Sequence, residues 1–223
     1  MILIFGGRSV KIDFDAAIFD MDGTLLDTMP YWRFTGLEYI LKHGYPLRLD
    51  YVARMYAEAS KKLLPLYAAE EGIELDMKEV VRELEEFMNR HYLNDARAKP
   101  HVREFLELLK EKGIPMCVAT GTPRDYARNA FARVGFTDYF AFVTDHYETE
   151  YTKSDPAYFI NLADRLGVRP EKCIVFEDAL YAMKTAKEVG MTVCAIEDGA
   201  QASDREKIKN LADIYIRDFA ELL

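Results

Sequence analysis

The sequence predicts an α/β protein: a doubly wound, Rossmann-like parallel sheet, interrupted near its start by an all-helical insert. Short apolar runs with little polar alternation recur along the chain, as strands covered on both faces require. Helical stretches that end in glycine separate these runs, and such alternation is typical of a parallel sheet. Residues 30–97 show helical spacing and no apolar runs of this kind, which predicts the insert.

Six apolar runs are the expected strands of the sheet. They cover residues 16–20, 114–120, 141–145, 173–178, 191–196 and 213–216. The first fourteen residues predict a separate feature, in which a Gly6-Gly7 turn joins two short strands. We expect this hairpin at a sheet edge.

Four amphipathic stretches connect the later strands and are the expected helices of the sheet layers. They cover residues 101–113, 123–135, 155–167 and 179–190, and each ends at a glycine. Glycine is common after the last helical residue because it tolerates the left-handed backbone conformation. Asp155 followed by Pro156 predicts an N-cap with proline in the first helical turn.

The insert is expected to contain at least three helices. The last of them follows an Asp76-x-x-Glu79 pair that resembles a capping box. Its predicted buried face consists of Val80, Leu84, Phe87, Met88 and His91. Residues 31–44 and 51–64 are two further helical candidates. We therefore expect a catalytic core domain of residues 1–29 and 98–223, and a helical cap domain of residues 30–97.

Composition narrows the possible partners and surroundings. Half of the 223 residues are hydrophobic, and the net charge is −9, which disfavours nucleic acid and anionic membrane surfaces. No run reaches the ~18 apolar residues of a membrane span, and the opening residues do not resemble a secretory signal. Three cysteines lie in apolar runs, which predicts that they are reduced residues of the core. We expect a cytoplasmic monomer or weak homodimer.

Polar residues cluster where the expected strands end. Asp20 ends the first strand, with Asp22 just beyond it. Thr120-Gly121-Thr122 follows the second strand, and Glu177-Asp178 follows the fourth. Lys153 lies in the loop before a helix. If these strands are neighbours, the carboxylates, a hydroxyl and an ammonium converge on one crevice. Clustered carboxylates need a cation, and oxygen ligands suit Mg²⁺.

Four short motifs in this order resemble the haloacid dehalogenase superfamily. The segment DMDGTLLD at residues 20–27 resembles its first motif, and ATGTP at 119–123 its second. KSDPAYF at 153–159 and VFEDALYA at 175–182 resemble the third and fourth. With the expected helical cap, the resemblance points to the β-phosphoglucomutase and phosphoglycolate phosphatase-like branch of the superfamily.

The resemblance implies a role for each matched residue. Asp20 would be the nucleophile that forms an aspartyl-phosphate, and Asp22 the general acid and base. Thr120, with Gly121 and Thr122 of its loop, would bind the phosphoryl group, and Lys153 would neutralise charge beside it. Mg²⁺ would be held by Asp20, the Asp22 backbone and Asp178, with Glu177 close by. The implied activity is a Mg²⁺-dependent phosphatase of a small phosphorylated metabolite.

The same resemblance leaves alternatives open. A sugar phosphomutase of the β-phosphoglucomutase type uses the same aspartyl-phosphate chemistry, although Trp32 stands where its hinge histidine is expected. Ala179 and Ala182 replace the usual serine and glycine of the fourth motif, and the lost serine could loosen the surroundings of Asp178. A third interpretation of the sequence is a ligand-binding protein that has this fold but no catalytic activity.

Overall fold

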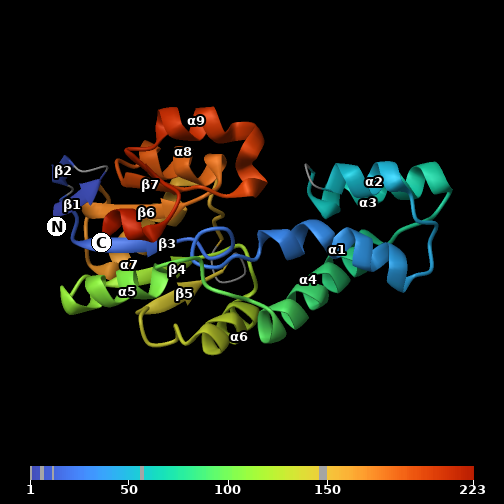
Figure 1. The fold of residues 1–223 in the computed structure, drawn as a ribbon, viewed down its shortest axis with the longest axis horizontal. Coiled ribbons are helices and arrows are strands. Elements are labelled where there is room, and N and C mark those ends of the chain that lie inside the picture. The colour runs from blue at the N-terminus through green and yellow to red at the C-terminus, as the bar shows by residue number, and fades with distance from the viewer. Residues whose placement is uncertain (1, 6–7, 12, 56–57, 146–149) are drawn as a thin grey trace. The chain divides into compact units, whose positions relative to one another are not determined.

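The computed structural model describes residues 1–223 except residues 1, 6–7, 12, 56–57 and 146–149. Its backbone divides into two compact units (Figure 1). The α/β unit is formed by residues 1–27 and 97–223, and the helical unit by residues 28–96. That these units act as a catalytic core and a cap stays a prediction.

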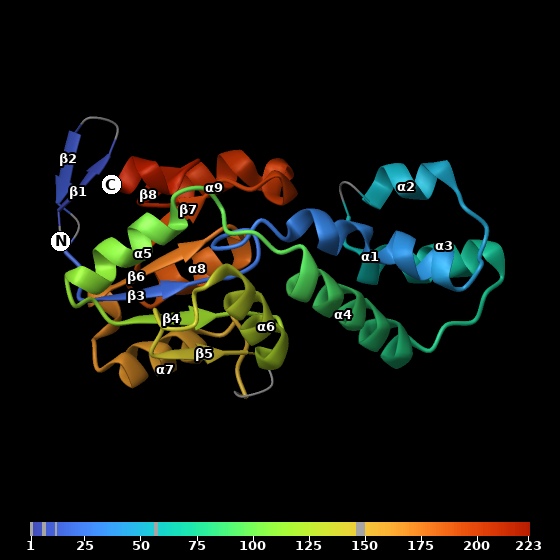
Figure 2. The ribbon, with the colours of Figure 1, turned by 60° about the horizontal axis from the view of Figure 1, so that its bottom comes forward.

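A six-stranded parallel sheet lies at the centre of the α/β unit (Figure 2). Its order is β5-β4-β3-β6-β7-β8. The strands are β3 (Ala16–Phe19), β4 (Met116–Ala119), β5 (Phe142–Thr144), β6 (Cys173–Glu177), β7 (Thr192–Ile196) and β8 (Ile214–Ile216). All six predicted strands are confirmed, and their order is that of a Rossmann-like sheet. The direction of strand addition reverses between β3 and β6, which is where open α/β sheets bind ligands.

Both faces of this sheet are buried, as the lack of polar alternation predicted. Ala16 and Ile18 of β3 belong to an apolar cluster with Tyr158 and Leu162. The opposite face carries an aromatic cluster, in which Phe19 stacks on Phe176 with ring centroids 4.5 Å apart. Further rings from residues 105, 140 and 219 extend this cluster. The sheet is therefore fixed from both sides, and its strand ends are held in place.

Helices between the strands complete the α/β unit. They are α5 (Val102–Glu111), α6 (Arg124–Val134), α7 (Pro156–Leu166), α8 (Leu180–Glu188) and α9 (Arg205–Leu211), with 3-10 turns η1 (Pro170–Lys172), η2 (Gly199–Asp204) and η3 (Phe219–Leu222). The four predicted helices correspond to α5–α8, and the glycines that follow them have φ between +67° and +83°. The predicted N-cap is confirmed, since Asp155 accepts a hydrogen bond from the Ala157 N–H at 2.9 Å.

The helical unit contains α1 (Met29–Lys42), α2 (Leu49–Met55), α3 (Ser60–Glu71) and α4 (Met77–Asn94). Val80, Leu84, Phe87 and Met88 of α4 are buried as predicted, whereas His91 is only half-buried. Asp76 caps α4 through the Lys78 N–H, but the capping box is wrong, because Glu79 accepts from Arg82 instead.

The prediction of one helix over residues 51–64 is also wrong, since α2 ends at Met55 and α3 begins at Ser60. Ser60 is buried. Its hydroxyl donates to the Arg33 carbonyl at 3.2 Å and accepts from the Gly36 N–H at 3.0 Å. These bonds fix a new helix start that local hydrophobic spacing does not reveal.

The N-terminal strands β1 (Ile2–Phe5) and β2 (Arg8–Lys11) pair antiparallel, as the predicted hairpin requires. They form a two-stranded sheet of their own and not an edge of the large sheet, and the Gly6-Gly7 turn lies outside the described residues. Within the described ranges, no helix is both long and apolar enough to cross a bilayer.

Candidate active site

The carboxyl ends of three adjacent strands bring the predicted site residues together. Asp20 follows β3, Thr120 follows β4, and Glu177 is the last residue of β6, with Asp178 next to it. Since β4, β3 and β6 are parallel neighbours, these residues lie at one edge of the sheet. The Asp20 N–H donates to the Phe176 carbonyl at 2.9 Å, which extends the β3–β6 ladder to the site.

A group of three buried carboxylates forms the centre of the site. One oxygen from each of Asp20, Glu177 and Asp178 lies within 4.8 Å of the other two. The Lys153 ammonium pairs with Asp20 Oδ1 and donates to Glu177 Oε2 at 2.8 Å. Three acids and one lysine leave an excess of negative charge, which a divalent cation can offset.

Burial and mutual repulsion control the protonation of this group. Burial, and next the Glu177 carboxylate, raise the pKa of Asp20 to about 7, although Lys153 opposes the change. Burial, followed by Asp20 and Glu177, raises the pKa of Asp178 well above its usual value. For Lys153, burial lowers the pKa, but Asp20 and Glu177 outweigh it, so its pKa lies well above the ordinary value. The lysine therefore carries its charge at neutral pH.

The donor set fits a hard divalent cation. Every ligand atom offered is a carboxylate oxygen, the type that Mg²⁺ prefers. Asp20 Oδ2 is buried and has no hydrogen-bond partner in the described part of the chain. A buried, unbonded carboxylate oxygen is costly unless a cation or a reacting group uses it.

The loop after β3 turns sharply because Gly23 adopts a φ of +90°, a backbone conformation that glycine adopts without steric cost. The Gly23 N–H then donates to the Leu26 carbonyl at 2.9 Å, and this closes the turn. Asp22 lies inside the turn and its Oδ2 accepts a 2.7 Å hydrogen bond from Thr122 Oγ1. The Asp22 side chain is thus oriented by the loop that follows β4.

A comparison with protein families now identifies the chain. The family model described as haloacid dehalogenase-like hydrolase matches residues 14–190. The chain belongs to this family. It is accordingly a hydrolase, and the superfamily prediction made from the four motifs is confirmed.

Curated relatives of this haloacid dehalogenase-like hydrolase include sugar-phosphate phosphatases. The phosphorylated carbohydrates phosphatase of Thermotoga maritima is 30% identical over 177 residues, which cover 79% of this chain and 82% of the relative. The fructose-1-phosphate phosphatase of Escherichia coli is 29% identical, over 78% of this chain and 92% of the relative.

Solved structures agree with the fold of the family. A Thermotoga maritima protein named for β-phosphoglucomutase has a TM-score of 0.76 and 27% identity, with 94% of this chain and 97% of that chain covered. A predicted phosphoglycolate phosphatase of Haemophilus somnus has a TM-score of 0.79, covers 95% of this chain and 97% of that chain, and at 21% identity supports the fold alone.

The structure places the sequence-predicted residues of this hydrolase in two groups. Asp20, Lys153, Glu177 and Asp178 are in mutual contact or close proximity. The loop residues form the second group, in which Thr120 Oγ1 accepts from the Thr122 N–H at 3.0 Å and Thr122 reaches Asp22. The backbone of Gly121 is exposed and has open space where a Cβ would lie. The catalytic and binding roles of all these residues stay predictions.

Sequence reasoning missed Gln201, whose Nε2 donates to Asp178 Oδ2 at 3.3 Å. It lies in η2, five residues beyond the end of β7, the strand next to β6. In the sequence, only its position shortly after the end of a predicted strand indicates that it could reach the site.

Glu177 also makes contacts that the sequence did not predict, because its Oε1 accepts hydrogen bonds from the backbone N–H groups of Asp178 and Ala179. This carboxylate supports the start of α8, where Ala179 provides no side-chain cap.

Proposed function

We propose that this haloacid dehalogenase-like hydrolase is a Mg²⁺-dependent phosphatase of small phosphorylated carbohydrates, acting through an aspartyl-phosphate on Asp20. The observation that carries the proposal is the asymmetry of the Asp20 carboxylate. Its Oδ1 pairs with Lys153, whereas its buried Oδ2 has no hydrogen-bond partner among the described residues. The substrate class rests on the carbohydrate-phosphate and fructose-1-phosphate phosphatases among its relatives.

Two displacements at phosphorus make up the proposed reaction. In the first, an Asp20 oxygen attacks phosphorus while the bond to the ester oxygen breaks, and Asp22 gives that departing oxygen a proton. In the second, Asp22 takes a proton from a water that attacks the aspartyl-phosphate. The Asp20–phosphorus bond breaks, inorganic phosphate leaves, and the Asp20 carboxylate is regenerated.

Charge and orientation come from the surrounding side chains. Lys153 stays protonated and offsets negative charge beside Asp20. Thr122 orients Asp22 through the 2.7 Å hydrogen bond, and we propose that Thr120 binds phosphoryl oxygens. Acid–base catalysis supplies only about 10²–10⁴-fold, while uncatalysed phosphate monoester hydrolysis can require up to about 10²¹-fold. Positioning and charge must therefore provide most of the acceleration.

In this proposal Asp20, Asp178 and the Asp22 backbone carbonyl hold Mg²⁺. When bound, the ion supplies positive charge that stabilises the phosphoryl oxygens and keeps the group in line. Glu177 is the weaker ligand, because Lys153 and two backbone N–H groups already bond its oxygens. Its main role is to hold Lys153 and the Asp178 backbone in place.

The three cysteines, Cys117, Cys173 and Cys194, are free and buried, as predicted. Free thiols are ordinary in a reducing compartment. We therefore propose that the enzyme acts in the cytoplasm.

The deciding experiment measures phosphate release from a panel of phosphorylated compounds, with MgCl₂ and with EDTA. The panel contains fructose 1-phosphate, glucose phosphates, hexitol phosphates and phosphoglycolate. We expect Mg²⁺-dependent release from a few sugar phosphates, and none from Asp20→Asn. Asp15→Asn is the matched control, because Asp15 is exposed at the opposite end of β3. Equal release by Asp20→Asn and wild type would contradict the nucleophile assignment.

A sugar phosphomutase is the second candidate, favoured by the likeness to the protein named for β-phosphoglucomutase. The same panel separates the two activities when a sugar bisphosphate primer is added. A mutase interconverts hexose phosphates and releases little free phosphate, whereas the proposed phosphatase releases phosphate in step with substrate loss.

A further inference from the structure

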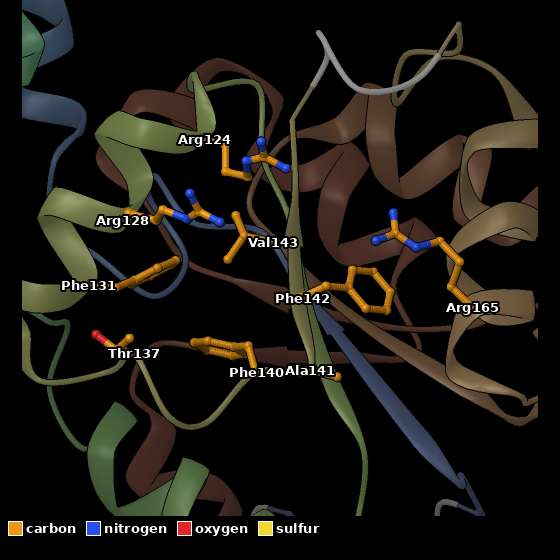
Figure 3. Close-up of a pocket in the computed structure, with 9 residues that line it drawn as sticks. All are labelled: Arg124, Arg128, Phe131, Thr137, Phe140, Ala141, Phe142, Val143 and Arg165. Atoms are coloured by element: carbon orange, nitrogen blue, oxygen red, sulfur yellow. The ribbon is translucent and has the colours of Figure 1, made fainter.

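A pocket with a volume of about 330 Å³ lies at the β5 edge of the large sheet (Figure 3). Its walls come from α6, the segment between α6 and β5, β5 itself, and α7. The residues that line it include none of the candidate active-site residues. Its volume is at the lower end of the range for small-molecule sites, about 300–1,000 Å³. That size favours a small molecule over a peptide or a protein surface.

Three guanidinium groups line this pocket, and none of the described residues that line it carries a carboxylate. Figure 3 shows Arg124 and Arg128 of α6 on one side of β5 and Arg165 of α7 on the other. This concentration of positive charge occurs in a chain whose net charge is −9. Guanidinium groups match phosphate oxygens in a planar, two-pronged geometry, so the lining is suited to an anion.

The existing contacts of two of these arginines leave them able to take an anionic partner. Arg165 Nη1 donates to the hydroxyl of Thr144, a neutral acceptor, at 2.9 Å. Arg128 approaches Asp125 only to 3.5 Å, and its side chain is 63% exposed. Exposed pairs of this kind contribute little free energy. A phosphate can therefore compete for Arg128 at little cost.

Aromatic rings form the apolar part of the pocket. Phe131 and Phe140 lie with ring centroids 5.4 Å apart on the Arg128 side of β5 (Figure 3). Phe142 lies on the other side, where the Arg165 guanidinium covers its ring at 3.8 Å from the centroid. Phe140 is only half-buried. Its ring gives a planar ligand a surface to stack on.

We propose that this pocket binds a small organic anion that carries both a phosphate group and a planar aromatic ring, as a nucleoside monophosphate does. The guanidinium groups hold the phosphate, and the half-buried Phe140 ring contacts the planar ring. The compound is a ligand of a second site and not a substrate there, because no candidate catalytic residue lines the pocket.

Calorimetric titration with adenosine monophosphate tests this proposal. The background is Asp20→Asn in EDTA, so that the probe is neither hydrolysed nor held through a metal ion. In that background, Arg128→Gln/Arg165→Gln should weaken binding about tenfold or more, as expected when charged hydrogen bonds are lost. The matched control, Arg205→Gln/Arg217→Gln, removes two arginines that pair with Glu197 in the same unit, and should change affinity less than twofold.

Two further measurements keep the test decisive. Arg128→Gln alone removes an exposed side chain, so the fold is not at risk, and it should still weaken binding about threefold or more. Ribose 5-phosphate, which lacks the planar ring, should bind at least about fivefold more weakly than the nucleotide. Three results would overturn the proposal: no wild-type binding at millimolar nucleotide, equal losses in both double variants, or equal affinity for ribose 5-phosphate.

Discussion

At the scale of single residues, the two oxygens of Asp20 have different surroundings. One is paired with Lys153, and the other is buried without a partner among the described residues. The lysine thus serves two purposes. It supplies positive charge beside three acids, and it pairs with one Asp20 oxygen while the other, which the proposed reaction uses, stays unbonded among the described residues.

Replacing Lys153 tests how much the buried charges depend on it. Lys153→Met leaves the Asp20 and Glu177 carboxylates buried without their cation, and breaking a buried pair costs about 3–5 kcal/mol. We expect the free energy of unfolding in EDTA, measured by urea denaturation, to fall by about that amount. Adding Asp20→Asn should restore part of it, because one of the unpaired charges is then removed.

The matched control is Lys172→Met, which removes a half-buried lysine that pairs with the exposed Asp13 at the surface. Surface pairs contribute about 0–1 kcal/mol, so this variant should be nearly neutral. Equal losses in Lys153→Met and Lys172→Met would show that the buried ammonium is not needed for stability.

Thr122 is predicted to act on catalysis through Asp22. Thr122→Val removes the hydroxyl that donates to Asp22 Oδ2 at 2.7 Å. If Asp22 is the general acid and base, kcat should fall about tenfold with little change in KM, since only part of the 10²–10⁴-fold acid–base contribution depends on orientation. Thr122→Ser keeps the hydroxyl and should recover most of the rate. A kcat unchanged in the valine variant would argue against this role.

At the scale of elements, the helical unit contains a buried acid that joins two helices. Glu83 of α4 bonds Lys42 at the end of α1 at 2.7 Å and His43 just beyond it at 3.1 Å. Burial raises the pKa of Glu83, but Lys42 and His43 together outweigh burial, and the net pKa is lowered. The charged form therefore stabilises the contact between α1 and α4.

This shift predicts an acid-sensitive helical unit. Because the folded pKa is below the unfolded one, the stabilisation is complete above the unfolded pKa, which is about 4.3, and is lost as pH falls through the folded pKa. Trp32, the only tryptophan of the chain, lies in this unit, so its fluorescence can follow urea unfolding. Glu83→Gln should be less stable than wild type at pH 7, with a difference that shrinks toward pH 3. A difference that is constant over this range would contradict the prediction.

Much of the large sheet was predictable from the sequence, because strands that are buried on both faces consist of continuous apolar runs. The helix-ending glycines are equally local signals, and Gly113, Gly135, Gly167 and Gly190 all have positive φ. The break between α2 and α3 was not predictable, since it depends on bonds from Ser60 to α1. Neither the Gln201 contact with Asp178 nor the arginine pocket follows from local pattern, because both depend on which strands become neighbours.

At the scale of the whole molecule, the proposed Mg²⁺ site formed by the three buried carboxylates would link metal binding to stability. Asp20, Glu177 and Asp178 come from two strands of one sheet, so their repulsion acts against the folded α/β unit. A ligand present at 100 times its Kd stabilises the folded state by about 2.7 kcal/mol. For a chain of this size, that corresponds to a rise in Tm of about 5–10 °C.

Thermal unfolding followed by circular dichroism, with EDTA and with MgCl₂, measures this effect. We expect Mg²⁺ to raise Tm in the wild type, and Asp178→Asn to remove most of the rise. Asp213→Asn serves as the control, because Asp213 is a surface acid that pairs with Lys187 and lies outside the carboxylate group. A rise of the same size in Asp178→Asn would place the ion elsewhere.

The position of β3 in the sheet also bears on how the chain is made. This strand is the first of the large sheet to be synthesised, yet both of its partners, β4 and β6, begin only at Met116 and Cys173. While the ribosome translates the intervening segments, β3 and Asp20 cannot pair with β4 or β6, because those strands have not been synthesised. Contacts between segments so distant in the sequence also slow folding. A nascent chain released before Cys173 has Asp20, the proposed nucleophile, but lacks the strand beside it and the carboxylates of Glu177 and Asp178. Translation must therefore pass beyond Asp178 before an active site can exist.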